Sequence, residues 1–237
     1  MKYMGSKSRH AKEIIPYLMS GHTEDMWYIE PFVGGANMID KVPCKNKYGF
    51  DINKYLIDMY KCAVNGWLPR NDYTEDEYKE IRSNKPDGSP LTAYFGFALS
   101  YGGKWFGGWR RDKAGKRNYV MESYNNALKQ FPLLKDIKFA CRSVFSIDDI
   151  PNKSTIYCDP PYMGTTKYKD DFDHDKFWDW CRYQASQGHR VFVSEYHAPE
   201  DFSCVWEKQV NSSLTLNTGS KKNVEKLFFI GEDSDGE

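Results

Sequence analysis

Four consecutive residues directly follow the short apolar run 155–158: Asp159, Pro160, Pro161 and Tyr162. An ionised Asp accepts hydrogen bonds, while a prolyl residue fixes its own φ and donates no N–H, so the Pro-Pro step is stiff and offers carbonyl acceptors. The Tyr ring is a flat surface on which a base can stack. This combination suits a reaction at the exocyclic amine of adenine, a poor nucleophile because its lone pair is delocalised into the ring. The alternative interpretation is a tight turn after a strand, with an exposed Tyr.

A glycine-containing turn follows another predicted strand, residues 27–30, and includes Gly34 and Gly35. Glycine lets the backbone approach a ligand without a Cβ in the way. Asp51 ends the next predicted strand, 48–50, and a carboxylate there can bind both hydroxyls of a ribose. The sequence contains neither GxGxxG nor GxxxxGK[ST], so no phosphate cradle is expected. A nucleoside without phosphate, such as the one in S-adenosylmethionine, therefore fits better than a nucleotide triphosphate.

Strands and helices alternate at both ends of the chain. Helices are predicted at about 54–65, from the T-x-x-E capping box at Thr74, and from Asp173 to Gly188. This alternation predicts an α/β fold with a parallel sheet, whose ligands bind at the carboxyl ends of the strands. The remaining predicted strands are 137–141, 156–158, 190–194 and 227–230.

The middle of the chain, residues 66–135, has no clean alternation and is rich in Gly, aromatic and basic residues. We expect an inserted recognition segment that contacts nucleic acid, because glycine doublets, aromatics and cations are gathered there. The alternative is a solvated loop whose aromatics cover an edge of the core. The net charge of the whole chain is zero, but this local excess of cations leaves a nucleic-acid partner open. The proposed contacts are Lys104, Trp105, Arg110, Arg111, Lys113, Lys116 and Arg117.

Length and composition set the remaining bounds. A chain of 237 residues with 40% hydrophobic and 16% aromatic residues is enough for one domain with an insertion and a substantial core. No apolar run approaches ~18 residues, so we expect no membrane span. The six cysteines form no CxxC and have no His at metal-ligand spacing, which favours free thiols in a reducing cytosol and no bound metal. Residues 232–237 form an acidic tail.

The chain resembles the Dam-type family of adenine-N6 DNA methyltransferases, in a phage-sized form of phage or prokaryotic type. The resemblance rests on four segments in the family's order: Tyr3-Met4-Gly5-Ser6-Lys7, Glu30-Pro31-Phe32-Val33-Gly34-Gly35, Asp51 and Asp159-Pro160-Pro161-Tyr162. It implies a Rossmann-like class I methyltransferase sheet with helices on both faces. The implied divisions are a cofactor-binding half (1–65), a target-recognition insertion (66–135), a catalytic half (136–231) and the acidic tail. Ala36 departs from the family, where many members have a second glycine, and its methyl is expected to narrow the methionine pocket.

The resemblance also implies roles for individual residues. Asp159 and the carbonyl of Pro160 would accept the two protons of the target amine, Pro161 would stiffen the motif, and Tyr162 would stack on the flipped base. S-adenosylmethionine would be the cofactor. The residues implied to bind it are Tyr3, Lys7, Glu30, Phe32 and Gly34 on its methionine side, Asp51 at the ribose, Val144 and Phe145 beside the adenine, and Asp159.

Double-stranded DNA is the expected partner, in the cytosol of a prokaryote or of a phage-infected host. Three alternatives stay open. The same acceptor geometry suits cytosine-N4 or RNA, although family members that act on cytosine-N4 more often have Ser in place of Asp159. A small-molecule methyltransferase does not explain the basic, aromatic segment. A catalytically inactive DNA-binding relative does not explain an intact Asp159 and Tyr162.

Overall fold

The structure is a computed structural model that describes residues 1–112, 114–151, 153–162, 172–211 and 222–231. The α-helices are α1 (Ala11–Met19), α2 (Lys54–Val64), α3 (Glu75–Asn84), α4 (Pro90–Ala93), α5 (Tyr119–Gln130) and α6 (His174–Ser186). The strands are β1 (Trp27–Glu30), β2 (Asn46–Asp51), β3 (Ile137–Cys141), β4 (Ser154–Cys158), β5 (Arg190–Glu195), β6 (Ser203–Asn211) and β7 (Lys222–Ile230). Single turns of other helix types are η1 (Lys7–Arg9), η2 (Tyr94–Ala98, a π-helix), η3 (Tyr101–Gly103), η4 (Phe131–Leu134) and η5 (Val144–Ser146).

The strands of the described residues form one sheet in the order β3-β2-β1-β4-β5-β7-β6. Its first five positions have the 3-2-1-4-5 order of doubly wound, Rossmann-like folds, which confirms the predicted α/β fold. One edge departs from the parallel arrangement, because β7 runs antiparallel to both β5 and β6. The sequence analysis missed β6. Because β6 is an edge strand, much of it is exposed and it lacks the continuous apolar run of a central strand.

The chain divides into two compact units, and the first comprises residues 1–11 and 33–142. In this unit β2 and β3 pair in parallel, with Asp51 opposite Cys141. Helix α2, predicted at about 54–65, packs on β3 and buries Leu56, Met59 and Tyr60. Its first turn is capped by the side chain of Asn53, which accepts hydrogen bonds from the Tyr55 and Leu56 amides. The predicted capping box at Thr74 and Glu77 begins α3 as expected.

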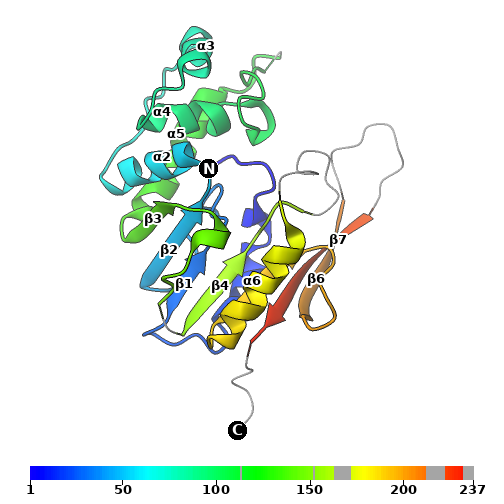
Figure 1. Ribbon diagram of the computed structural model, residues 1–237. Helices are drawn as coiled ribbons and strands as arrows, with labels where there is room; N and C mark the ends of the chain where they lie inside the picture. Colours follow the sequence, from blue (N-terminus) through cyan, green and yellow to red (C-terminus); the bar gives the residue numbers. More distant parts are fainter. Residues whose placement is uncertain (113, 152, 163–171, 212–221, 232–237) are drawn as a thin grey trace. The chain divides into compact units, whose positions relative to one another are not determined.

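The second unit comprises residues 12–32 and 143–237. Its strands β1, β4 and β5 are parallel, and β7 and β6 continue the sheet (Figure 1). Helix α6 begins after its cap, Asp173, and buries Phe177, Trp178 and Cys181; it contacts β5 and β7. The chain turns at Gly188, which has the positive φ expected after a helix end.

Residues 66–135 all belong to the first unit and contain α3, α4, η2, η3, α5 and η4. Residues 90–98 of this segment form α4, followed directly by the π-turn η2. In this segment the described residues form no strand, only an isolated bridge between Ser100 and Trp109. Its assignment to target recognition stays a prediction. Among the helices described, none is both long enough and apolar enough to cross a membrane.

Candidate functional site

Acidic side chains of the second unit follow the carboxyl ends of its parallel strands. Residue 29 of β1 lies opposite residue 156 of β4, and residue 158 of β4 lies opposite residue 193 of β5. This register brings Glu30, Asp159 and Glu195 to the same edge of the unit's sheet. Ligands of open α/β sheets bind at that edge. Glu30 and Glu195 are buried, whereas Asp159 is partly exposed.

Tyr162 is held by two contacts within this unit. Its hydroxyl donates a hydrogen bond to Glu225 Oε2 at 2.9 Å. Its ring packs against that of Tyr196 in a T-shaped arrangement, with ring centroids 4.7 Å apart and ring planes at 84° to each other. Burial raises the pKa of Tyr162 well above its ordinary value, and the charges of Asp159 and Glu225 add to that rise. The phenol therefore stays protonated and acts as a donor.

Glu30 has a hydrogen bond within its own strand. The hydroxyl of Tyr28, which is fully buried, donates to Glu30 Oε1 at 2.7 Å. Burial, and then the charge of Glu30, raise the pKa of Tyr28 well above its ordinary value, so the Tyr28 hydroxyl stays protonated and donates this hydrogen bond. Because charge-assisted hydrogen bonds are stronger than neutral ones, Glu30 is held firmly at the end of β1.

An aromatic cluster joins two of the predicted cofactor residues. Phe32 and Phe145 both contact Phe172, with ring centroids 5.7 Å and 5.9 Å from it. Phe32 also packs on Phe177 of α6. The neighbouring Val144 is 2% exposed, so its side chain contributes to packing in the unit. The structure thus brings Phe32 and Phe145 into contact with one ring.

In the first unit, the glycine turn is tied to the end of β2. Asp51 Oδ2 accepts a hydrogen bond from the Gly34 amide at 2.9 Å, and Tyr60 donates to the Gly34 carbonyl at 2.5 Å. Asp51 Oδ1 accepts from the Asn53 amide at 2.9 Å. Burial raises the pKa of Asp51, while the hydrogen bonds from Asn53 and Gly34 oppose that rise. Asp51 thus shapes the turn in addition to the ribose role predicted for it.

Tyr3 covers this glycine turn. Gly34 has φ +44°, and a Cβ placed there would lie 2.8 Å from Tyr3 Cε1. At Gly35 a Cβ would lie 2.7 Å from Tyr3 Cβ, and at Gly103 it would lie 2.9 Å from the Tyr3 backbone. Close approach therefore requires glycine at all three positions. Lys7, predicted to pair with the cofactor carboxylate, is 7% exposed in η1.

Ala36 has φ +52°, a conformation that glycine adopts more easily. This is the position at which many members of the resembled family have glycine. The Ala36 side chain is fully buried, and the narrowing of the methionine pocket by its methyl stays a prediction. Gln130, at the end of α5, donates to the carbonyls of Gly35 and Ala36 at 3.1 and 2.9 Å and so holds the turn from the other side.

Arg110, one of the predicted DNA contacts, is held within the protein. Its side chain is 9% exposed and pairs with Glu122 at 2.9 Å. It also donates to Ser123 Oγ and the Ala98 carbonyl, both at 3.2 Å, and its guanidinium lies 4.3 Å from the Tyr119 ring. These contacts give Arg110 a packing role, because they occupy several of the N–H donors of its guanidinium.

The other predicted DNA contacts differ in their surroundings. Arg111 is exposed and forms a bidentate salt bridge with Glu75, in which Nε lies 3.0 Å from Oε2. Trp105 is half-buried and stacks on Tyr55 at 5.4 Å. Lys104 is also half-buried, Lys116 and Arg117 are exposed beside the turn that Asp112 organises, and Lys113 lies outside the described residues.

Sequence reasoning missed four residues that hold this machinery: Tyr60, Gln130, Tyr196 and Glu225. Tyr60 and Gln130 carried no signal, because each acts on a turn distant in sequence. Tyr196 directly follows β5, and the rule that ligands bind at carboxyl strand ends could have drawn attention to it. Glu225 lies before residue 227, where the last strand was predicted to begin, whereas β7 begins at 222 and includes it.

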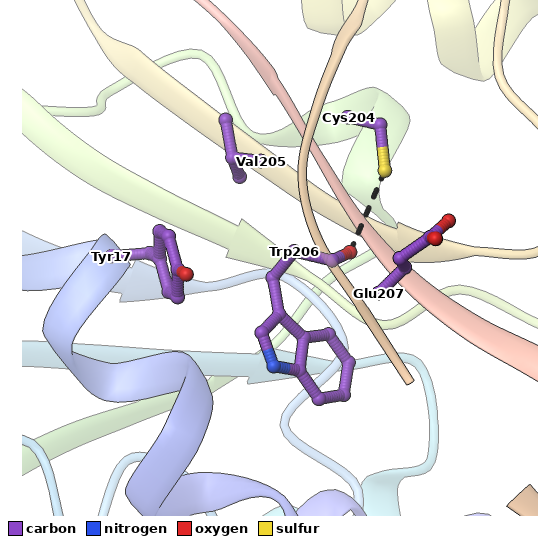
Figure 2. Close-up of a pocket in the computed structure, with 5 residues that line it drawn as sticks. All are labelled: Tyr17, Cys204, Val205, Trp206 and Glu207. Atoms are coloured by element: carbon purple, nitrogen blue, oxygen red, sulfur yellow. Dashed lines mark hydrogen bonds between the residues drawn. The ribbon is translucent and has the colours of Figure 1, made fainter. Parts of the chain in front are cut away.

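A surface hollow is lined by Tyr17 of α1 and by residues 204–207 of β6 (Figure 2). None of the residues predicted for the site lies in it. Over the described part of the chain, no group of three or more His, Cys, Asp or Glu side chains is arranged to hold a metal ion.

Residues 3–96 match the family model of D12 class N6 adenine-specific DNA methyltransferases. This segment contains the glycine turn and Asp51, and it ends before the Asp159 motif. The chain is also 23% identical over 208 residues to the type II methyltransferase M.FokI of Planomicrobium okeanokoites, with 78% of this chain covered. The chain spans only 32% of the length of that relative.

Two solved structures have weaker likeness. An rRNA methylase from Streptococcus thermophilus is 7% identical, with a TM-score of 0.41 over 93% of this chain and 95% of the other. A putative methyltransferase solved as a complex with SAH is 12% identical, with a TM-score of 0.39 over 98% of this chain and 54% of the other. Scores this low do not establish a shared fold, so the fold rests on the strand order.

Proposed function

We propose that the protein is a site-specific DNA methyltransferase that transfers a methyl group from S-adenosylmethionine to the N6 amine of adenine. One observation carries the proposal. Asp159, at the carboxyl end of β4, leads through the stiff Pro160–Pro161 step to Tyr162, whose ring is held by Glu225 and Tyr196. The match of residues 3–96 to an adenine-specific family supports the same reading.

The residues present suit this cofactor. S-adenosylmethionine supplies a methyl group already activated on a sulfonium. An ionised Asp51 can accept hydrogen bonds from ribose hydroxyls, and Gly34 offers a backbone without a Cβ beside it. The proposed cofactor-binding residues are Tyr3, Lys7, Glu30, Phe32, Gly34, Asp51, Val144, Phe145 and Asp159.

The chain's own residues would act on the amine. Lifting an adenine out of the duplex costs a few kcal/mol, and stacking on Tyr162 offsets part of that cost. Asp159 and the Pro160 carbonyl would accept hydrogen bonds from the two amine N–H groups and draw the nitrogen toward a tetrahedral geometry, which frees its lone pair for attack. As the N–C bond forms, the bond between the methyl group and sulfur breaks and leaves a neutral thioether. The nitrogen then releases one proton, to Asp159 or to water. Positioning supplies much of the remaining acceleration.

We further propose that DNA contacts the first unit through basic side chains, three of them exposed and one, Lys104, half-buried. Lys104, Arg111, Lys116 and Arg117 fit this role, because their charged groups can neutralise phosphates. Arg110 fits it less well, since its guanidinium is engaged inside the protein. In this role the enzyme would work in the cytosol of a prokaryote or of a phage-infected host, in a restriction–modification system or alone.

Product analysis tests the proposed function directly. Unmethylated duplex DNA is incubated with the protein and S-adenosylmethionine, digested to nucleosides, and examined by mass spectrometry. We expect N6-methyladenine with the parent protein and none with Asp159→Ala. Finding N4-methylcytosine, or methylation of RNA alone, would redirect the proposal to those substrates. Absence of any methylated nucleoside, together with DNA binding, would favour an inactive binding relative.

A further inference from the structure

The ring of Tyr162 is fixed at two points by residues outside the Asp159–Tyr162 motif. Its hydroxyl donates to Glu225 Oε2 at 2.9 Å, across 63 positions of sequence. Its ring packs against Tyr196 in a T-shaped arrangement with centroids 4.7 Å apart. The first contact anchors the far end of the ring, and the second restricts the tilt of its plane.

The sheet explains how Glu225 reaches this place. Strand β7 runs antiparallel to β5 with Lys226 opposite Glu195, so Glu225 comes opposite Tyr196. On its other side β7 pairs with β6, where Glu225 lies opposite Lys208. The ladder with β6 therefore holds the backbone of Glu225, and the ladder with β5 ends at the neighbouring Lys226. A side chain on such a strand is a firmer support than one on a loop.

The contact is suited to orienting the ring. An ionised carboxylate that accepts from a phenol makes a charge-assisted hydrogen bond, which is stronger than a neutral one. Burial keeps the pKa of Tyr162 well above its ordinary value, so the donor proton is retained. A Tyr without these contacts would lose rotamer freedom when a base stacks on it, and that loss would weaken stacking.

We propose that Glu225 is a positioning residue that pre-orients Tyr162 for the flipped adenine, with Tyr196 supporting the ring. This inference rests on the proposed function. It differs from a role in which Tyr162 supplies only a ring, because it makes the hydroxyl of Tyr162 necessary for full activity.

Four variants test the contact: Glu225→Leu, Glu225→Gln, Tyr162→Phe and the double variant Tyr162→Phe/Glu225→Leu. We expect Glu225→Leu and Tyr162→Phe each to lower kcat about tenfold, the order of one charge-assisted hydrogen bond. The double variant should fall no further than either single one, because both remove the same bond. Glu225→Gln keeps an acceptor oxygen and should stay within about threefold of the parent.

A matched control separates positioning from loss of structure. Tyr157 is fully buried on β4, and its hydroxyl makes a 2.9 Å hydrogen bond with Ser194 Oγ. Tyr157→Phe therefore removes a phenol hydroxyl whose hydrogen bond has the same length but does not involve Tyr162 or Glu225. We expect it to lower Tm while leaving kcat unchanged. The affinity for S-adenosylmethionine, measured by calorimetry, should be the same in the parent, Glu225→Leu and Tyr162→Phe.

A second readout does not depend on methylation. In protein with isotope-labelled tyrosines, the Tyr162 ring resonance is identified as the one missing from Tyr162→Phe. We expect it to shift in Glu225→Leu and to stay in place in Tyr157→Phe. A Tyr162 resonance unmoved by Glu225→Leu, additive losses of kcat, or full activity of Tyr162→Phe would each overturn the positioning role. If Glu225→Leu shifts the Tyr162 resonance but the parent protein methylates nothing, the proposed function is refuted and the contact between Glu225 and Tyr162 stands.

Discussion

The Asp51 carboxylate holds the amide of Gly34, with 2.9 Å from the amide nitrogen to Oδ2. One side chain therefore shapes the glycine turn and is the proposed acceptor for ribose hydroxyls. Removing it would change both at once. A variant that loosens the turn and leaves the carboxylate in place is needed to separate the two roles, and Tyr60 offers it, because its hydroxyl binds the Gly34 carbonyl at 2.5 Å.

We expect Asp51→Ala to weaken binding of S-adenosylmethionine by roughly 1.5–3 kcal/mol, the range for hydrogen bonds to a charged group. Tyr60→Phe, which releases the turn only at Gly34, should weaken it much less. Calorimetric titration of both folded variants measures the difference. Equal losses in the two variants would assign the effect to the shape of the turn and contradict a ribose contact by Asp51.

Asp159→Ala should reduce methylation by orders of magnitude, because it removes an acceptor needed most in the transition state. The fold should persist, since Asp159 is partly exposed just beyond β4. Single-turnover rates and Tm measure the two effects. Asp179→Ala is the control, because it removes an exposed carboxylate of α6 that is paired with Arg182. A rate for Asp159→Ala close to that of the parent would refute the catalytic assignment.

The basic residues of the first unit should separate into two classes. Each phosphate contact contributes about −0.9 to the slope of log affinity against log salt. Replacing Lys116 and Arg117 together by Ala should therefore flatten the slope by about 2, while Tm stays within the error of the measurement.

Arg110→Ala should do the reverse: it should lower stability by about 1–3 kcal/mol, because it breaks a buried network, and leave the slope unchanged. Binding titrations at several salt concentrations, with denaturant unfolding, distinguish these results. An unaltered slope in the double variant would move the DNA surface elsewhere.

Gly34→Ala should lower both stability and cofactor affinity. An L side chain at φ +44° costs about 1–2 kcal/mol, and the new Cβ would lie 2.8 Å from the Tyr3 ring. Gly88→Ala is the matched control: Gly88 has φ +67°, but a Cβ there would meet nothing within 4 Å. We expect both variants to lose stability in urea unfolding and Gly34→Ala alone to lose affinity in calorimetry. An unchanged affinity in Gly34→Ala would count against cofactor binding at this turn.

His189 should make stability depend on pH. Its Nδ1 lies 3.1 Å from the Ser154 amide, which donates to it, and burial lowers its pKa below 6.5. The unfolded chain therefore binds more protons than the folded one as the pH falls below about 6.5, so this group's contribution is complete above that pH and lost on acidification. The free energy of unfolding should fall by up to about 1.4 kcal/mol per pH unit from this group. His189→Gln should remove the contribution of His189 to the slope of the unfolding free energy against pH. Urea unfolding of parent and variant across the pH range measures this slope. The same slope in parent and variant would contradict it.

The sequence by itself was enough for the features that depend on neighbouring residues. The capping box at Thr74, the helix from Lys54 and the strand before Asp159 follow from hydrogen bonds and apolar spacing within a few positions. These signals are local, so they act wherever the segment lies. The pattern of β6 was not enough, because an exposed edge strand depends on pairing with its neighbour β7.

Only the tertiary structure decided which distant side chains meet. The contact of Tyr162 with Glu225 follows from the register of β7 against β5, and the engagement of Arg110 with Glu122 follows from how the chain before α5 packs on that helix. A residue's type states which bonds it can make, whereas packing selects the partner and sets its burial. For that reason two adjacent arginines, 110 and 111, had the same chemistry in the sequence and have different surroundings in the fold: the first is 9% exposed and the second 64%.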